Sequence, residues 1–302
     1  MTARTTADLA AHGFSPEPEE GLWFPLTKSE LTAVVAAALE EDDTRHDLTS
    51  VATVLSDRTA RCRMVARRAG VIAGLPLARE AFEQLDADVN VRLDVEDGAH
   101  VKPGTPLMFL SGHARCLLSA ERVALNFVQR LSGVATLTAR YVEAVQGTKA
   151  KILDTRKTTP GWRKLERYAV RAGGGMNHRF NLGSAVLIKD NHLAAVDGDI
   201  NVAVRRARAV SPEGTSVEVE CETLAQVATA ISAGADVILL DNMKLNEMKA
   251  SVELVSGRAV TEASGGITLD TVGAVARTGV DWISVGALTH SAPALDIGLD
   301  FD

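Results

Sequence analysis

Cysteines, aromatic residues and long apolar runs are all scarce in this sequence. The 302 residues include three cysteines, Cys62, Cys116 and Cys221, which are odd in number, far apart and without a CxxC pair. This pattern argues against a disulfide framework and a zinc site, and it is typical of a reducing cytoplasm. No apolar run approaches the roughly 18 residues of a membrane span. We therefore expect a cytoplasmic protein without a membrane segment.

The start of the chain has no apolar core of the kind that a signal peptide carries. Four acidic residues, Asp8, Glu17, Glu19 and Glu20, also argue against a transit peptide, because transit peptides are poor in acids. We expect residues 1–26 to form a loosely ordered extension.

Positive charge is concentrated in one stretch of an otherwise acidic chain. The net charge is -7, yet residues 156–179 hold seven Lys or Arg residues and a single acid, Glu166. A local basic concentration beside apolar strands predicts a pocket for a small anionic ligand. The acidic net charge and the aromatic content of 4% argue against nucleic-acid binding. An alternative applies to four residues at helical spacing, which could form a solvated helix face: Arg163, Lys164, Arg167 and Arg171.

The first half of the chain predicts helices around a small sheet. Thr27 and Glu30 have the spacing of a capping box, and an amphipathic helical pattern follows them. Residues 61–112 alternate as strands around one helical segment. Ser119 to Val145 then reads as a long helix, for which we predict a break at Ser132-Gly133.

From about residue 150 onward, strands and helices alternate. The predicted strands are Lys151–Leu153, Ala185–Ile188, Ser216–Glu220, Val237–Leu240, Ala259–Glu262 and Trp282–Val285. This order indicates parallel βα units. Because the segment is short for an eight-unit barrel, we predict an incomplete or compact α/β barrel, with an open doubly wound sheet as the alternative.

Each predicted strand of this region runs into polar residues or glycines at its carboxyl end. In a parallel barrel these ends share one mouth, where such folds place their chemistry. The groups are Asp154/Arg156/Lys157, Lys189/Asp190, Glu220, Asp241/Asn242, Ser264-Gly265-Gly266 and Gly286.

Two of these groups suggest specific ligands. Glu220 and Asp241 could hold Mg²⁺, partly through water, although ion pairs with Lys189 or Arg156 would explain them equally well. The glycines after the last two strands let the backbone approach a ligand closely, and this predicts phosphate binding there.

With these residues assembled, residues 28 to 300 resemble the quinolinate phosphoribosyltransferase family. The resemblance is carried by Asp154 to Pro160, Gly173 to Arg179, Leu187 to His192, Glu121-Arg122, Val217 to Glu220, Leu239 to Asn242 and Glu262 to Ile267. It implies an α/β fold with an N-terminal α/β sandwich at 27–132 plus the tail 289–302. An incomplete α/β barrel would span 133–288, and the chain would form a head-to-tail homodimer.

The resemblance also implies an activity and a role for each site residue. Quinolinate and phosphoribosyl pyrophosphate would react, with Mg²⁺, to nicotinate mononucleotide, CO₂ and pyrophosphate. Lys157, Lys189, Glu220 and Asp241 would be catalytic, with Glu220 and Asp241 handling Mg²⁺ and the ribose. The substrate-binding residues would be Arg156, Lys157, His178, Arg179 and Lys189, with Arg122 from the partner subunit and Ser264, Gly265, Gly266 and Gly286 on the 5′-phosphate.

The chain departs from the family pattern at three places. These are Phe180-Asn181, Gly183-Ser184 and the acidic turn at 42–47. Two rival functions follow from the resemblance and the site: a molybdenum-transport-associated paralogue of the same fold, and a non-catalytic phosphoribosyl-binding sensor. The retained Arg122, Arg156, Lys189 and Glu220 argue against the paralogue.

Overall fold

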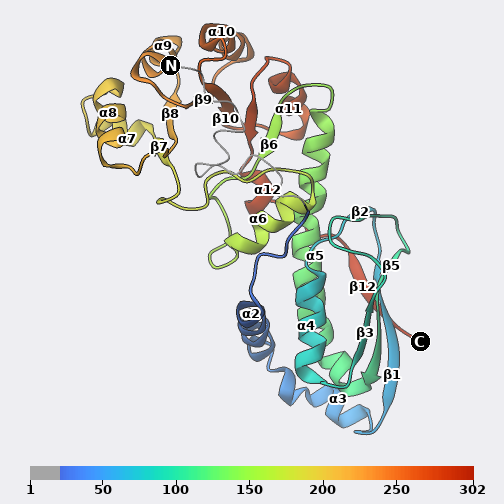
Figure 1. Cartoon of the computed structure of the whole chain (residues 1–302). Coiled ribbons are helices and arrows are strands. Elements are labelled where there is room, and N and C mark those ends of the chain that lie inside the picture. Colours follow the sequence, from blue (N-terminus) through green and yellow to red (C-terminus); the bar gives the residue numbers. More distant parts are fainter. Residues whose placement is uncertain (1–20) are drawn as a thin grey trace. The chain divides into compact units, whose positions relative to one another are not determined.

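The computed structural model describes residues 21–302, which fall into two compact units (Figure 1). Unit 1 holds residues 140–158 and 175–290, and unit 2 holds residues 21–139, 159–174 and 291–302. Of the predicted extension 1–26, the first twenty residues lie outside the described part. Residues 21–26 form no helix or strand, and Phe24 packs edge-on against Tyr168 with 5.3 Å between ring centroids.

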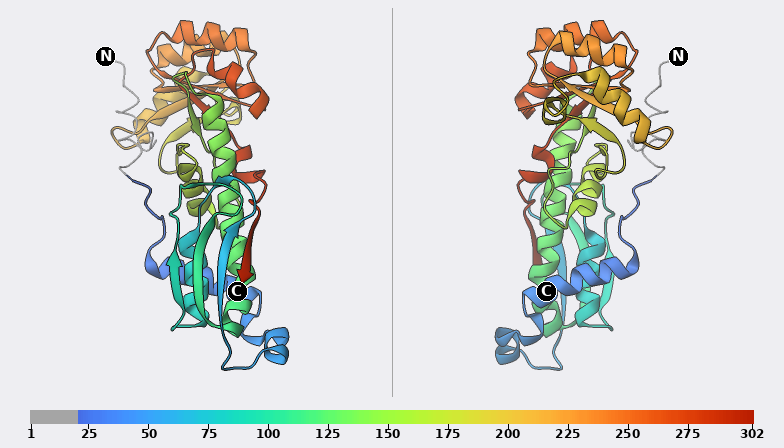
Figure 2. Two further views of the ribbon diagram at one scale, coloured as in Figure 1. Left: turned by 90° about the vertical axis from the view of Figure 1, so that its right-hand side faces the viewer. Right: turned by 90° about the vertical axis from the view of Figure 1, so that its left-hand side faces the viewer.

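Unit 2 is built on a four-stranded antiparallel sheet in the order β12-β1-β5-β3. Cys62, Met64 and Ala66 alternate with more exposed residues along β1, so one face of this sheet is buried. Helices α4 and α5 run along the sheet (Figures 1 and 2). The elements of unit 2 are α2 Lys28–Glu41, η1 Thr44–His46, α3 Leu48–Thr53, β1 Thr59–Ala66, β2 Gly70–Val71, α4 Leu75–Leu85, β3 Asn90–Leu93, β4 His100–Val101, β5 Pro106–His113, most of α5 Ala114–Ala144, α6 Arg163–Ala172 and β12 Ile297–Phe301.

The long helix α5 corrects one prediction. It continues without a break through Ser132 and Gly133, where we predicted an interruption. A side chain at Gly133 would lie 2.2 Å from the backbone oxygen of Pro293, and the Ser132 hydroxyl accepts a hydrogen bond from the backbone N–H of Ala73. The two residues therefore serve close packing against neighbouring backbone, which local sequence signals do not distinguish from a helix break.

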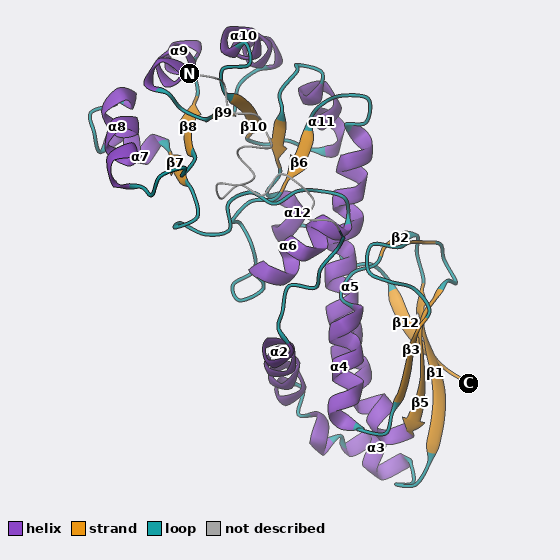
Figure 3. Ribbon diagram, in the orientation of Figure 1, coloured by secondary structure: helices purple, strands orange, loops and turns teal. Residues whose placement is uncertain are grey.

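Unit 1 confirms the predicted alternation of strands and helices (Figure 3). Its six parallel strands lie in the order β6-β11-β10-β9-β8-β7, and the described residues form no pairing between β6 and β7, so the barrel is incomplete. Leu153, Val237, Val260 and Trp282 share its apolar core. Its elements are β6 Lys151–Leu153, β7 Val186–Ile188, α7 Asp190–Ala194, α8 Ile200–Val210, β8 Val217–Cys221, α9 Leu224–Ala233, β9 Val237–Asp241, α10 Leu245–Val255, β10 Val260–Ser264, α11 Leu269–Ala276, β11 Trp282–Ser284 and α12 Ala287–His290.

The boundary between the units runs through α5, between Ala139 and Arg140. The predicted limits, at 132/133 and 288/289, stay a prediction. Residues 159–174 group with unit 2, although those limits put them in the barrel. Among the described residues, no helix is long and apolar enough to span a bilayer.

Helix α6 carries the four basic residues that could have been a solvated face. Lys164 is exposed and pairs with Glu30 at 2.5 Å. Arg171 donates to the carbonyl of Gly21, and Arg167 is buried. A uniformly solvated face does not describe this helix, because three of its four basic residues are partly or fully buried.

The same helix contributes a buried carboxylate that closes a clamp within unit 2. Glu166 is fully buried and accepts hydrogen bonds from Arg130 at 2.7 Å, from the Thr159 hydroxyl at 2.8 Å and from the Thr159 backbone N–H at 2.9 Å. Thr159 directly follows residues 156–158, so these hydrogen bonds fix the chain just after Arg156 and Lys157.

Replacing Glu166 with glutamine should destabilise unit 2. The substitution removes the buried negative charge that pairs with Arg130 at 2.7 Å, which costs about 3 kcal/mol. Urea denaturation followed by far-UV circular dichroism measures the loss. Glu41→Gln, an exposed residue at the end of α2, is the control and should unfold as wild type. Equal midpoints for both variants would show that the clamp adds nothing to stability.

Candidate active site

A cavity of about 830 Å³ opens where the strands of unit 1 end. This volume lies within the range of small-molecule sites, roughly 300–1,000 Å³. Residues at or just beyond the carboxyl ends of all six parallel strands line it, which is the position expected for the chemistry of such a fold.

Eleven of the twelve predicted site residues line this cavity. They are Arg156, Lys157, His178, Arg179, Lys189, Glu220, Asp241, Ser264, Gly265, Gly266 and Gly286. The twelfth, Arg122, belongs to unit 2, where it is exposed on α5. The roles predicted for these residues stay predictions.

Asp154 organises the basic end of strand β6. Its buried carboxylate accepts hydrogen bonds from the backbone N–H of His178 at 2.8 Å and from the side chain of Asn177 at 2.6 Å. A second link joins Met176 to Ile152 and Asp154 through backbone hydrogen bonds. Residues 176–178 are therefore fixed beside β6.

Arg156 follows Asp154 and is half-buried in the wall of the cavity. Its buried Nε has no hydrogen-bond partner among the described residues. A guanidinium N–H without a partner in such a place is costly unless a ligand satisfies it. Burial and the charge of Arg156 lower the pKa of Arg179, and Glu218 opposes them. The two guanidinium groups thus form a site that favours an anion.

The loop at 180–184, where we predicted departures from the family pattern, has its own hydrogen bonds. The Asn181 side chain accepts from the Gly183 backbone N–H at 2.9 Å. The Ser184 hydroxyl accepts from the Asn181 backbone N–H at 3.1 Å and donates to its carbonyl at 3.1 Å. These hydrogen bonds close the loop on itself, and the Arg179 side chain donates to the Ala185 carbonyl at 2.9 Å.

Two carboxylates face the cavity from the ends of β8 and β9. Burial and the negative charge of Asp241 raise the pKa of Glu220, and Lys189 acts in the opposite direction. Asp241 accepts hydrogen bonds from the Ser264 hydroxyl and from the side chain of Asn242, each at 2.6 Å. The pair is close enough to repel, so a cation between them would relieve that repulsion.

The glycines after β10 approach the neighbouring strand end closely. Gly265 has φ +92°, and a side chain there would lie 2.2 Å from the amide oxygen of Asn242. Asn242 itself has φ 52°, which is uncommon for a residue other than glycine. By contrast, a side chain at Gly266 would meet nothing within 4 Å, so its backbone borders open space. These contacts leave a small backbone-lined recess that suits a phosphate.

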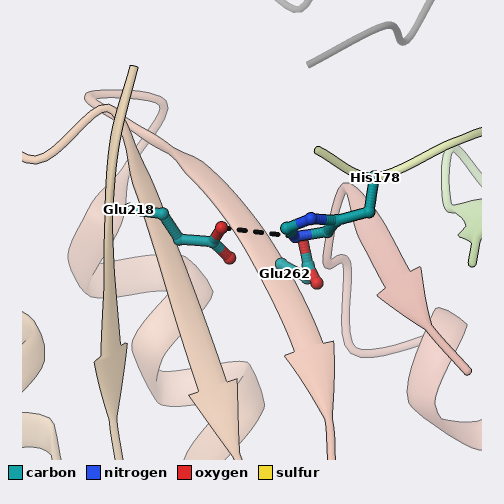
Figure 4. Close-up of side chains that lie close together, drawn as sticks. All are labelled: His178, Glu218 and Glu262. Carbon is teal, nitrogen blue, oxygen red and sulfur yellow. Dashed lines mark ion pairs between the residues drawn. The ribbon is translucent and has the colours of Figure 1, made fainter. Parts of the chain in front are cut away.

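Inside the barrel, three buried polar side chains meet (Figure 4), and two of them, His178 and Glu262, also line the cavity. The Nε2 of His178 lies 3.3 Å from Glu218 on β8 and 3.4 Å from Glu262 on β10. Burial lowers the pKa of His178 and the charges of Glu262 and Glu218 raise it. The backbone N–H of Arg179 donates to Nδ1 at 2.8 Å, and this opposes a second proton on the ring. Burial and the charge of Glu262 raise the pKa of Glu218 to about 7.

Glu218 and Glu262 were not among the predicted site residues. Their signal in the sequence was a carboxylate within a predicted strand, with Glu218 between two valines and Glu262 between Thr261 and Ala263. Asn242 and His290 also line the cavity and were not predicted to bind a ligand.

The sequence is similar to a described family over most of its length. The C-terminal domain of quinolinate phosphoribosyl transferase matches residues 134–300, and its N-terminal domain matches residues 47–132. The carboxylating nicotinate-nucleotide pyrophosphorylase of Mycobacterium leprae is 47% identical over 259 residues, which cover 84% of this chain and 90% of that protein.

Solved structures of similar proteins have the same fold. The structure of NadC from Streptococcus pyogenes is 42% identical with a TM-score of 0.87, covering 92% of this chain and 99% of that one. The nicotinate-nucleotide pyrophosphorylase of Francisella tularensis is 36% identical with a TM-score of 0.88, covering 92% and 98%. The chain therefore belongs to the quinolinate phosphoribosyltransferase family.

Proposed function

We propose that this protein converts quinolinate and phosphoribosyl pyrophosphate to nicotinate mononucleotide, CO₂ and pyrophosphate, a step of NAD biosynthesis. The observation that carries the proposal is the cavity itself. It joins a cationic wall with Arg156, Arg179 and Lys189 to a carboxylate pair and a glycine-lined recess. Few small molecules other than a dicarboxylate and a phosphorylated sugar would need all three.

The residue types suit the two substrates. Quinolinate carries two carboxylates, and arginine can hold a carboxylate through two parallel hydrogen bonds. Arg156, Arg179, His178 and Lys189 would form this part of the site, with Lys157. The backbone of Lys157 is held by the Thr289 hydroxyl, which donates to its carbonyl at 2.7 Å. Ser264, Gly265, Gly266 and Gly286 would hold the 5′-phosphate.

The reaction needs no protein nucleophile. The ring nitrogen of quinolinate attacks C1 of the ribose, and the bond from C1 to pyrophosphate breaks. The nitrogen is then cationic, so the adjacent carboxylate can leave as CO₂ while the ring holds the electron pair, and a proton takes its place on the ring carbon. The protein's contribution is to position the two substrates and to neutralise their charge.

Mg²⁺ is the metal that the donor set fits. Glu220 and Asp241 offer oxygen ligands, and their mutual repulsion favours a cation. Two carboxylates are too few to complete its coordination, so water or substrate phosphate would supply the rest. When bound, Mg²⁺ would neutralise charge on the pyrophosphate.

Removing the metal should abolish activity and leave the fold intact. EDTA is expected to stop product formation, and added Mg²⁺ should restore it, because the ion is expected to bind together with the pyrophosphate and not to stabilise the fold. The melting temperature of the protein without substrates, measured with and without EDTA, should barely move. A large drop in melting temperature would point to a structural metal instead.

We further propose a homodimer in which each site takes Arg122 from the partner subunit. Exposed apolar residues in and next to α3, Leu48, Val51 and Leu55, support a docking face on unit 2. The Ser119 hydroxyl on α5 donates to Asp47, the residue that caps α3, at 2.8 Å. This face therefore lies beside the part of α5 that carries Arg122. Cytoplasmic location and the absence of nucleic-acid binding stay predictions.

A direct assay tests the proposed activity. Purified protein with both substrates and Mg²⁺ should release CO₂ and form nicotinate mononucleotide. Tight binding of a phosphoribosyl compound without CO₂ release would favour the sensor, and binding of neither substrate would favour a differently specific paralogue. No described feature of the site favours either alternative.

A further inference from the structure

The function proposed above uses His178 but assigns no task to the two carboxylates beneath it. Glu218 is 0% exposed and Glu262 is 1% exposed. Both oxygens of Glu218 and one of Glu262 are buried without a geometrically complete hydrogen bond. Two carboxyl groups buried so close together cost stability, so a role in the site is a better explanation for them than stability.

The hydrogen bonds of His178 fix the position of its proton. Its Nδ1 accepts a hydrogen bond from the backbone N–H of Arg179 at 2.8 Å. A nitrogen that accepts cannot carry a proton, so the ring proton lies on Nε2, the atom that faces Glu218 and Glu262. The carboxylates and the amide thus favour the same tautomer from opposite sides of the ring.

We propose that Glu218 and Glu262 are positioning residues, which hold His178 as the Nε2–H tautomer and thereby fix the backbone of Arg179 at the cavity. The link is short, because the ring that the carboxylates orient is the ring that accepts the Arg179 amide. Arg179 in turn lines the cavity and is held at its other end by the Ala185 carbonyl at 2.9 Å. The expected effect on catalysis rests on the function proposed above, whereas the expected effect on the position of the His178 ring proton does not.

A metal ion is the main competing explanation. The three side chains offer donor atoms within 4.8 Å of one another, which is close enough for a shared ion. A neutral histidine that binds a metal through Nε2 carries its proton on Nδ1, where the Arg179 amide already points. The hydrogen bond to Nδ1 therefore favours a proton between the three groups.

The charge of the two carboxylates makes a second explanation testable. Negative charge beneath a cationic site would by itself weaken anion binding, so its removal would tighten the binding of quinolinate. If the carboxylates act by positioning, their removal should instead weaken quinolinate binding. Arg179 then loses its fixed backbone, and Glu218 no longer offsets the repulsion between Arg179 and Arg156. The direction of the change in quinolinate affinity separates the two explanations.

The test uses Glu218→Gln, Glu262→Gln and the double variant in the full-length protein. Glu253→Gln, which removes an exposed charge on α10 of the same unit, is the control. We expect KM for quinolinate to rise about tenfold or more in the double variant, with KM for phosphoribosyl pyrophosphate changed less than about twofold. The control should match wild type, and circular dichroism shows whether each variant is folded.

The position of the His178 ring proton can be measured by spectroscopy, without an activity assay. Long-range ¹H–¹⁵N spectra of labelled protein report which ring nitrogen carries the proton, and His178→Asn identifies the signal of His178. Wild type should show the Nε2–H form alone, and the double variant should also populate the other tautomer, because only the Arg179 N–H then favours Nε2–H. If wild type had no activity but the ring still changed in this way, the proposed function would fail and the positioning of His178 would stand.

Three results would overturn the proposal. The first is tighter quinolinate binding in the double variant, which leaves charge as the only effect. The second is a tautomer population of His178 in the folded double variant that is the same as in wild type. The third is a metal found at one equivalent in purified wild type and absent from the double variant.

Discussion

Arg122→Ala and Lys189→Ala are each expected to be nearly inactive alone and to regain about a quarter of wild-type activity when they are refolded together. The reason is the shared site. In a mixed dimer one site collects both substitutions and the other collects neither. Random reassortment at equal amounts makes half of the dimers mixed, each with one intact site of two.

The double variant Arg122→Ala/Lys189→Ala provides the matched control. Refolded with an equal amount of wild type, it should inactivate both sites of every mixed dimer, because each site takes Arg122 from one chain and Lys189 from the other. Only wild-type dimers then work, and activity should be about a quarter of that of the same total amount of wild type. If both residues act within their own chain, this mixture should keep about half of the wild-type activity, and the mixture of the two single variants should regain no activity.

Arg156→Ala is expected to weaken quinolinate binding by roughly 2–5 kcal/mol, about 30-fold to 4,000-fold. The side chain lines the cavity with a buried Nε that has no partner among the described residues, so its substrate contact has no protein substitute. The free energy of unfolding should not fall, because the substitution removes repulsion from Arg179. Titration calorimetry with quinolinate and urea denaturation measure the two quantities.

Arg156→Lys and Arg206→Ala complete this experiment. Lysine restores the charge but not the two parallel donors, so it should recover only part of the affinity. Arg206 is exposed on α8 of the same unit, and its loss should leave binding unchanged. Near-normal turnover of Arg156→Ala at low quinolinate would remove this residue from the site.

Much of unit 1 could be predicted because its signals are local. A buried parallel strand is a short apolar run, and the residue that follows it lies at the carboxyl edge of the sheet whatever the rest of the chain does. That is why Arg156, Lys189, Glu220 and Asp241 could be expected at one mouth, and they line one cavity.

Local signals failed where distant backbone decides the outcome. Ser132-Gly133 looks like a helix break, yet α5 continues, because Gly133 is needed where the Pro293 backbone approaches. The spacing of the basic residues on α6 left a solvated face open as an alternative, and the burial of Arg167 decides against a uniform one. At Gly133 the deciding neighbour, Pro293, lies far away in the sequence.

The sequence by itself determined the order of the βα units and the chemistry at each strand end, since both follow from patterns of two to four residues. Only the tertiary structure decided which buried side chains contact these groups from inside the barrel. Glu218 and Glu262 meet His178 because strands β8 and β10 flank β9 in the sheet and their registers bring both carboxylates to the same histidine. Such a meeting depends on strand order and register across three strands, and no single stretch of sequence contains either.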